Sequence, residues 1–440
     1  MKKALSITLA AGLASALQLQ AANSIFLTGS TAFRANVHDA CFKLFSPAPA
    51  VKYDTTKVIG GDGTSTNSNP VWTMTGTPIS AVTNISGTMT IYADFTGSIQ
   101  GIAAVENKTK LPYLNTDGTL RTNTPTIAFT DNSSGAVPYP AKGSFSEEQV
   151  AVQPFVIVKS NAGGVMNSIN NVTWEQLNNM VTLGSIPLST WTGNKAADYN
   201  TSIYLLQRTK DSGTRRTILA YLGYGYNQGV SVYNFDPTNN AIYSAVNSLN
   251  TAAGAPGYGV VGSAGVSGAN LNWGPGYVGG GDIKNAIKNT GSANLTLGYL
   301  SFADAKGITG VNWSQVISLN GVWPTAAGAA LHGNTGTNDF SPISAGCYGY
   351  WGYEVVVYPN VAPSSLSADQ DLVAGQLGNR TTPGTFLGVL DAQTYDGVLA
   401  TPAIGSLENE IENSKVNGAT AIRLSDMTSS RTSVGGTITP

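Results

Sequence analysis

The chain has 440 residues, of which 42% are apolar and only 11% are charged, and its formal net charge is −2. At roughly 100–200 residues per domain, this length predicts two or three domains with ample chain to bury a core. The low charge leaves no basic footprint for nucleic acid, and two histidines and two cysteines are too few for multi-ligand zinc, haem or iron–sulfur sites.

Residues 1–22 predict a secretory signal peptide. Basic residues at the N-terminus precede the short apolar run 4–13, and small residues allow cleavage after Ala16 or after Ala21. This run is too short to span a membrane. We therefore expect an exported protein, either periplasmic or extracellular.

The cysteines, Cys41 and Cys347, both follow the signal peptide. In an oxidising compartment such a pair can form one disulfide. The alternative is two separately buried thiols, and the sequence does not choose between them.

From residue 24 onward, short β-branched or aromatic runs alternate with segments of helical period. This alternation predicts βαβ units and a largely parallel sheet. In chain order the expected elements are a strand at 24–28, a helix through Phe33, Val37, Cys41 and Leu44, a strand at 90–93, a helix through Ile99, Ile102 and Glu106, strands at 126–130 and 151–158, a helix capped at Thr173 with Trp174, Leu177 and Val181 on its apolar face, a strand at 202–207, and a helix through Ile218, Leu219 and Leu222.

Two regions interrupt this alternation. Residues 60–86 are rich in Thr, Asn and Gly, which is typical of an excursion or of extra hairpins. Residues 252–281 are rich in Gly, Ser and Asn, which predicts a long surface loop within the second half of the chain.

Three of the expected strands lead into helices through small residues, at 29–31, 96–98 and 212–214. Each helix start offers unpaired backbone N–H groups and the positive end of the helix dipole. Such ends bind oxyanions, and open α/β sheets take ligands outside their strand ends. Capping alone also explains each single turn, so only the three together favour an anion site.

Arg208 and Asp131 also stand at predicted strand ends. The guanidinium could offer two parallel donors to an oxyanion, or make a surface ion pair. A carboxylate beside an anion is repulsive unless the anion carries a proton, as hydrogen phosphate does and sulfate does not. An unpaired buried acceptor would then reject sulfate. Asp131 could also be an ordinary helix cap.

Segment 208–214, Arg-Thr-Lys-Asp-Ser-Gly-Thr, resembles the phosphate motif of the substrate-binding proteins of phosphate ABC transporters. Segment 28–33 is similar to their first phosphate loop, and 96–98 and 128–131 stand where the family has its second loop and its proton-accepting carboxylate. Lys210 departs from the motif, which often has an aspartate there. The resemblance implies phosphate contacts from Ser30, Thr31, Ala32, Phe33, Ser98, Asp131, Arg208, Ser212, Gly213 and Thr214.

The resemblance covers nearly the whole mature chain in order, with long insertions, as in a divergent member of the family. It implies the α/β two-lobed fold of type II periplasmic binding proteins, in which each lobe is a mostly parallel sheet flanked by helices and the ligand lies in the cleft between lobes. The first lobe would comprise 23–155 plus 355–440 and the second 156–354. The two crossings would lie near 152–159 and 353–358.

We therefore expect a monomer without cofactor or metal that captures inorganic phosphate, either for an ABC permease in the inner membrane or for scavenging. Catalysis is not expected, because neither His38 nor His332 belongs to a recognisable triad pattern and Ser212 is not in a nucleophile elbow. The alternatives are a secreted or cell-surface structural or adhesive protein that reuses the fold, or a binder of a different oxyanion.

Overall fold

The computed structural model describes residues 23–55, 69–80, 82, 85, 87–136, 145–160, 163–209, 211–224, 230–236, 240–244, 276–277, 279–290, 294–306, 315–328, 339–359, 422 and 426–431. The predicted signal peptide at 1–22 lies outside them, as do Lys210, His332 and most of 252–281. In this part of the chain, no helix is long and apolar enough to cross a membrane.

The first lobe is built on a mixed sheet in the strand order β2-β3-β4-β1-β7-β16-β8. Its central strands β4, β1 and β7 are parallel, and the strands outside them are antiparallel. A separate hairpin, β5 and β6, lies beside β3 and β4. The bounds are β1 Ser24–Gly29, β2 Ala50–Tyr53, β3 Val71–Gly76, β4 Met89–Asp94, β5 Leu111–Leu114, β6 Leu120–Asn123, β7 Ile127–Thr130, β8 Phe145–Lys159 and β16 Trp351–Pro359.

The second lobe continues the same 14-stranded sheet in the order β8-β14-β11-β12-β13. Here β14, β11 and β12 are parallel, whereas β8, β10 and β13 pair with these strands in the antiparallel sense. Strand β15 is antiparallel to β8 and parallel to β9. The bounds are β9 Asn171–Val172, β10 Ser185–Pro187, β11 Ser202–Leu206, β12 Tyr233–Asp236, β13 Ala241–Ser244, β14 Leu295–Ser301 and β15 Val316–Leu319.

Helices follow the carboxyl ends of the parallel strands, as βαβ topology requires. In the first lobe α2 follows β1 and α3 follows β4, and in the second lobe α7 follows β11 and α9 follows β14. The bounds are α2 Arg34–Phe42, α3 Ser98–Glu106, α4 Trp174–Leu183, α5 Ser189–Thr192, α6 Lys195–Asp198, α7 Gly213–Tyr221, α8 Gly280–Asn289, α9 Phe302–Lys306 and α10 Ser341–Ser344, with 3₁₀ turns at η2 Ser134–Ala136 and η3 Gly164–Ser168.

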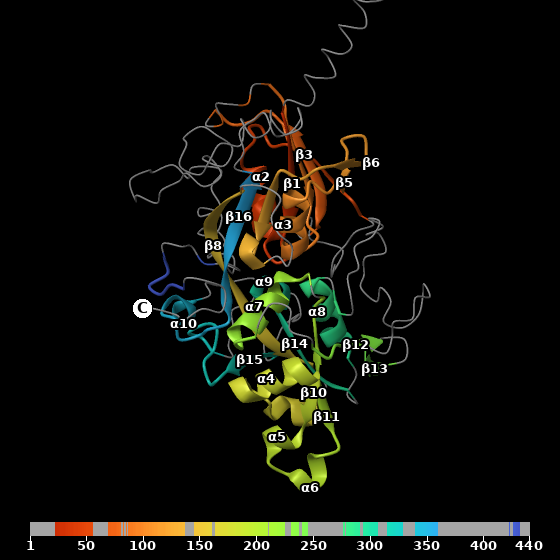
Figure 1. Ribbon diagram of the computed structural model, residues 1–440, viewed down its shortest axis with the longest axis vertical. Helices are drawn as coiled ribbons and strands as arrows, with labels where there is room; N and C mark the ends of the chain where they lie inside the picture. The colour runs from red at the N-terminus through yellow and green to blue at the C-terminus, as the bar shows by residue number, and fades with distance from the viewer. Residues whose placement is uncertain are drawn as a thin grey trace, which may run out of the picture.

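Strands β8 and β16 run from one lobe to the other (Figure 1). Residues of β8 up to Pro154 pair with β16, and from Phe155 onward they pair with β14 of the second lobe. The second crossing lies at the start of β16, because Tyr350 belongs to the second-lobe core. It comes earlier in the chain than the predicted 353–358, since Val355–Val357 already pair with β7 inside the first lobe.

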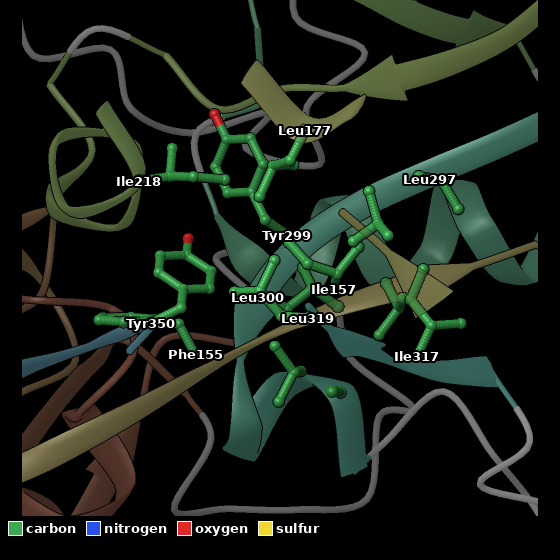
Figure 2. Close-up of a cluster of buried hydrophobic side chains, with 14 of the residues drawn as sticks. Phe155, Ile157, Leu177, Ile218, Leu297, Tyr299, Leu300, Ile317, Leu319 and Tyr350 are labelled. Carbon is green, nitrogen blue, oxygen red and sulfur yellow. The ribbon is translucent and has the colours of Figure 1, made fainter. Parts of the chain in front are cut away.

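Each lobe has its own hydrophobic core. In the second lobe, β8, β14 and β15 place Ile157, Leu297 and Ile317 in one cluster, and Tyr299 and Tyr350 extend from it toward α7 (Figure 2). A separate cluster between α2 and the first-lobe sheet includes Ile25, Leu27, Val37, Ala40 and Ile91. The helices of each lobe pack on that lobe's own core, so the loops that lead into these helices are held in place separately in each lobe.

The predicted α/β class is confirmed, and most predicted elements are found close to their expected positions. The capping box at Thr173 is present: its hydroxyl accepts from Gln176 N at 3.2 Å, and Gln176 Oε1 accepts from Thr173 N at 2.9 Å. Leu177 and Val181 are buried as expected. Trp174 was wrongly placed on the apolar face, because it lies in the first helical turn and is 36% exposed.

Two further expectations are corrected. Cys41 and Cys347 are both free thiols: Cys41 is buried in the first-lobe core, whereas Cys347 is exposed after α10 in the second lobe. They are therefore neither bonded nor both buried. Tyr277, which the composition assigned to a surface loop, is 1% exposed and pairs with Arg208 in a parallel bridge.

Of the predicted first-lobe segment 355–440, the structure describes 355–359, 422 and 426–431. Val356 and Tyr358 lie in the first-lobe core, whereas 426–431 contact the second lobe. Thr428 donates from its backbone N and its hydroxyl to the carbonyl of Ser344 in α10, at 3.1 and 3.0 Å. Met427 packs on the second-lobe core, and the guanidinium of Arg431 stacks 3.9 Å from the ring centre of Trp351. Residues 427–431 therefore contact α10 and the start of β16.

Candidate functional site

The loop after β1 makes the first of three helix starts at the junction of the lobes. Gly29 has φ +126°, which favours glycine, and the chain turns there so that Ser30 N donates to the carbonyl of Phe129 at 2.6 Å. The hydroxyl of Ser30 accepts from Ala32 N at 3.1 Å. Phe33 lies in the first-lobe core, whereas Ala32 packs against the second-lobe core. This loop therefore touches both lobes.

The second helix start, α3, lies beside the end of β7. Gly97 N donates to the carbonyl of Gly29 at 2.7 Å, which holds α3 next to the first loop. The Ser98 hydroxyl donates to the carboxylate of Asp131. Both side chains are 1% exposed. The first lobe thus presents a helix N-terminus and a buried carboxylate at the same point.

The third helix start, α7, comes from the second lobe and meets this carboxylate. Ser212 caps the helix by accepting from Arg215 N at 3.3 Å. A Cβ atom on Gly213 would lie 1.6 Å from Asp131 Oδ1 and 2.5 Å from the Ser98 hydroxyl. Only glycine allows the α7 backbone to approach this closely, so two helix N-termini from different lobes face each other across Asp131.

Arg208, two residues after β11, is 2% exposed and is held by several groups of the second lobe. Its Nε donates to the Tyr277 carbonyl at 3.2 Å, and its Nη1 lies 3.4 Å from the Thr214 hydroxyl. Its backbone N donates to the Tyr299 hydroxyl at 3.1 Å. The Tyr350 hydroxyl donates to the Thr214 carbonyl at 3.3 Å. Two tyrosines of the second-lobe core therefore hold the backbone at Arg208 and at Thr214.

Electrostatically, the junction balances buried charges of both signs. Burial raises the pKa of Asp131, and the hydrogen bond from Ser98 and the charge of Arg208 oppose this shift. Burial lowers the pKa of Arg208, and the negative charge of Asp304 is the strongest opposing influence. Burial also raises the pKa of Asp282, to about 6. The site can therefore accept a proton as well as donate hydrogen bonds.

The structure brings Ser98, Asp131, Arg208, Gly213 and Thr214 into one set of contacts, with Ser212 as the cap of α7. The first loop joins this set through the backbone links of Gly29 and Phe129 described above. All ten predicted residues are buried. Their binding role remains a prediction.

Arg34, Asp304 and Glu354 are among the buried charged residues that the sequence analysis did not identify. Arg34 directly follows the first loop, and Asp304 follows the end of β14 just as Arg208 follows β11, so their positions at helix starts were a usable signal. Glu354 of β16 is fully buried, and neither of its carboxyl oxygens has a hydrogen-bond partner among the described residues. Burial and the nearby charge of Asp131 raise its pKa well above the ordinary value, so we expect it to be protonated.

Two further arginines at the start of α7, Arg215 and Arg216, are also buried, with 8% and 2% of their surface exposed. Arg215 Nη1 donates to the Arg208 carbonyl at 3.0 Å.

His38 contacts Asp39 at 2.8 Å and the Tyr53 hydroxyl at 2.9 Å, away from the junction. Within the described residues, no group of three His, Cys, Asp or Glu could hold a metal ion.

No protein-family model matches the sequence, and no curated protein matches it significantly. Among solved structures, a protein assigned as a phosphate ABC transporter substrate-binding protein from Clostridium perfringens, with bound phosphate, is 12% identical with a TM-score of 0.40, over 91% of this chain and 100% of that chain. An ABC-type phosphate transport receptor from Vibrio cholerae is 12% identical with a TM-score of 0.33, over 80% and 92%. PstS from Borrelia burgdorferi is 12% identical with a TM-score of 0.31, over 81% and 93%. Likeness at this level does not assign a ligand to the present chain.

Proposed function

We propose that this chain is an exported substrate-binding protein that captures inorganic phosphate between its two lobes, for uptake by an ABC transporter or for scavenging. One observation carries the proposal. The N-termini of α3 and α7, which belong to different lobes, converge on Asp131 with the buried Arg208 beside them. Helix N-termini and a guanidinium are the donors that oxyanions bind.

The preference for phosphate rests on Asp131. Its carboxylate is 1% exposed, so a ligand that leaves it unpaired pays the full cost of a buried acceptor. Hydrogen phosphate can donate a hydrogen bond to this carboxylate while its remaining oxygens accept from Arg208, Thr214 and backbone N–H groups. Sulfate has no proton to donate at neutral pH, and it would be repelled.

Capture would use the hinge that β8 and β16 form. With the lobes apart, the α3 and α7 termini would be open to solvent, and closure would bury the ligand between them. The protein would be monomeric, and its output would be release of intact phosphate to a permease in the inner membrane, without a chemical step. Export would follow from the signal peptide.

Isothermal titration of the mature chain, unfolded to strip bound phosphate and then refolded, tests the proposal. Circular dichroism establishes that the sample is folded before phosphate and then sulfate are titrated. Tight binding of phosphate with silence from sulfate supports the proposal. Equal binding of both anions would indicate a receptor for another oxyanion. Silence with both would favour a secreted structural protein that reuses the fold.

A further inference from the structure

One ion pair among the described residues joins the two lobes. Nη2 of Arg34 lies 3.5 Å from Oδ1 of Asp304, and the two side chains are 7% and 5% exposed. Arg34 opens α2 and also donates from Nη1 to the carbonyl of Thr31 in the first loop. The pair therefore ties the first loop to α9 of the second lobe.

Asp304 is firmly placed within the second lobe. Its Oδ2 accepts from the Ser301 hydroxyl at 3.0 Å, and its backbone N donates back to that hydroxyl at 3.1 Å. A Cβ atom on Gly280 would lie 2.1 Å from Oδ2, so the first turn of α8 packs directly on the carboxylate. Helix N-termini favour negative charge. Asp304 is thus a fixed anion that meets Arg34 at the lobe junction.

The same carboxylate acts on Arg208. Its negative charge is the strongest of those that keep the buried guanidinium protonated. One carboxylate therefore compensates two arginines, Arg208 of its own lobe and Arg34 of the opposite lobe. The resulting chain of charges runs from the first loop, through Asp304, to the arginine beside Thr214.

The two ends of the ion pair are anchored in different cores. Val37, Ala40 and Cys41 fix α2 in the first-lobe core, and Phe302 and Ala305 fix α9 in the second-lobe core. Any hinge motion about β8 and β16 must therefore separate Arg34 from Asp304. In the open form water hydrates both side chains, whereas closure pairs them in a buried setting. Removing one of the two charges then destabilises the closed form, because the other charge is left buried without compensation.

We propose that Arg34 and Asp304 are positioning residues that form an interlobe latch, made on closure, which holds the closed form and sets the orientation of Arg208. The link from latch to ligand retention rests on the proposed function. The latch itself concerns only the relative position of the lobes, so it can be tested without a ligand.

The lobe distance can be measured between spin labels by pulsed electron paramagnetic resonance. Cys347 is exposed on the second lobe, and a Lys52→Cys substitution adds an exposed thiol on the first, while the buried Cys41 has its pKa raised far above the usual range and resists labelling. Distances are recorded with and without phosphate for the doubly labelled parent, Arg34→Gln, Asp304→Asn and the double variant.

The exposed pair Arg121 and Asp117 provides the matched control. Its atoms are 3.4 Å apart, but the side chains are 67% and 48% exposed, and such pairs contribute little. Arg121→Gln, Asp117→Asn and their double variant should leave lobe distances and phosphate affinity unchanged.

We expect each single latch variant to shift the lobe distances toward the open form and to speed phosphate release by about tenfold. The double variant should show the same shift and the same release rate as either single variant, because all three lose one and the same ion pair. Additive effects, or distances equal to those of the parent, would overturn the latch. If Asp304→Asn does not fold, Arg34→Gln and rescue by Arg34→Lys carry the test. If the parent does not bind phosphate but the distances still show the coupled shift, the latch stands and the proposed function fails.

Discussion

Replacing Asp282 by asparagine should stabilise the protein at neutral pH and leave it unchanged in acid. Asp282 stands in the first turn of α8, where its Oδ2 accepts from Gly279 N at 2.8 Å. Burial raises its pKa from the ordinary 3.8 to about 6, although the Gly279 hydrogen bond and the charge of Arg208 oppose the shift. Asparagine keeps an oxygen for Gly279 and removes the buried charge.

The sign follows from proton binding in the two states. Between the unfolded pKa of 3.8 and the folded pKa of about 6, the folded protein holds a proton that the unfolded chain has lost. Protonated Asp282 therefore favours the folded state fully below about pH 4, and this advantage disappears as the pH rises through about 6. A shift of roughly two units, at about 1.4 kcal/mol each, amounts to about 3 kcal/mol.

Urea unfolding of parent and Asp282→Asn, measured from about pH 4 to pH 8, checks this value. The difference in unfolding free energy should grow with pH in favour of the variant and level off above about pH 6 to 7. Asp117→Asn serves as the control of opposite sign, because hydrogen bonds from Thr119 lower the pKa of that exposed carboxyl. A difference independent of pH, or a parent that is more stable at neutral pH, would refute the reasoning and show that Arg208 compensates the charge completely.

Three further predictions concern the junction. Asp131→Asn should weaken phosphate binding by at least about tenfold and narrow its margin over sulfate in titration calorimetry; an unchanged ratio would remove Asp131 from the site. Gly213→Ala should abolish tight binding with little change in thermal midpoint, because the new methyl group would lie 1.6 Å from Asp131 Oδ1 and oppose closure; retained affinity would contradict the close approach. Arg208→Ala should cost about a hundredfold in phosphate affinity, whereas Arg121→Ala, at an exposed arginine, should cost nothing, and equal losses would mean that Arg208 is not at the ligand.

The α/β class could be predicted because local signals agree along the chain. The run 24–28 and the helical spacing through Val37 both point to the βαβ pattern that forms, as does the capping box at Thr173. Strand ends followed by small residues also predicted which helix starts would meet. Topology converts these local signals into proximity, since the carboxyl ends of parallel strands share one edge.

Pairings between distant segments could not be predicted in the same way. Nothing near Arg34 indicates Asp304, because their contact depends on how two separately closed cores meet. Similarly, nothing in the residues around Arg216 indicates that it is buried, yet it is 2% exposed. The placement of 426–431 on α10 likewise depends on tertiary packing that hydrophobic periodicity does not encode.

The distribution of charge gives an independent reason to place a ligand at the lobe junction. Only 11% of the residues are charged, yet Arg34, Arg208, Asp131, Asp282 and Asp304 are all buried there. Apolar residues of similar size would often hold two lobes together as well or better, because each buried charge carries a desolvation cost of several kcal/mol. A purely structural junction would therefore gain from losing these groups. A junction that opened, paired with a protonated anion and closed again would need donors and acceptors that water can satisfy in the open form, and the proposed function would therefore account for their presence.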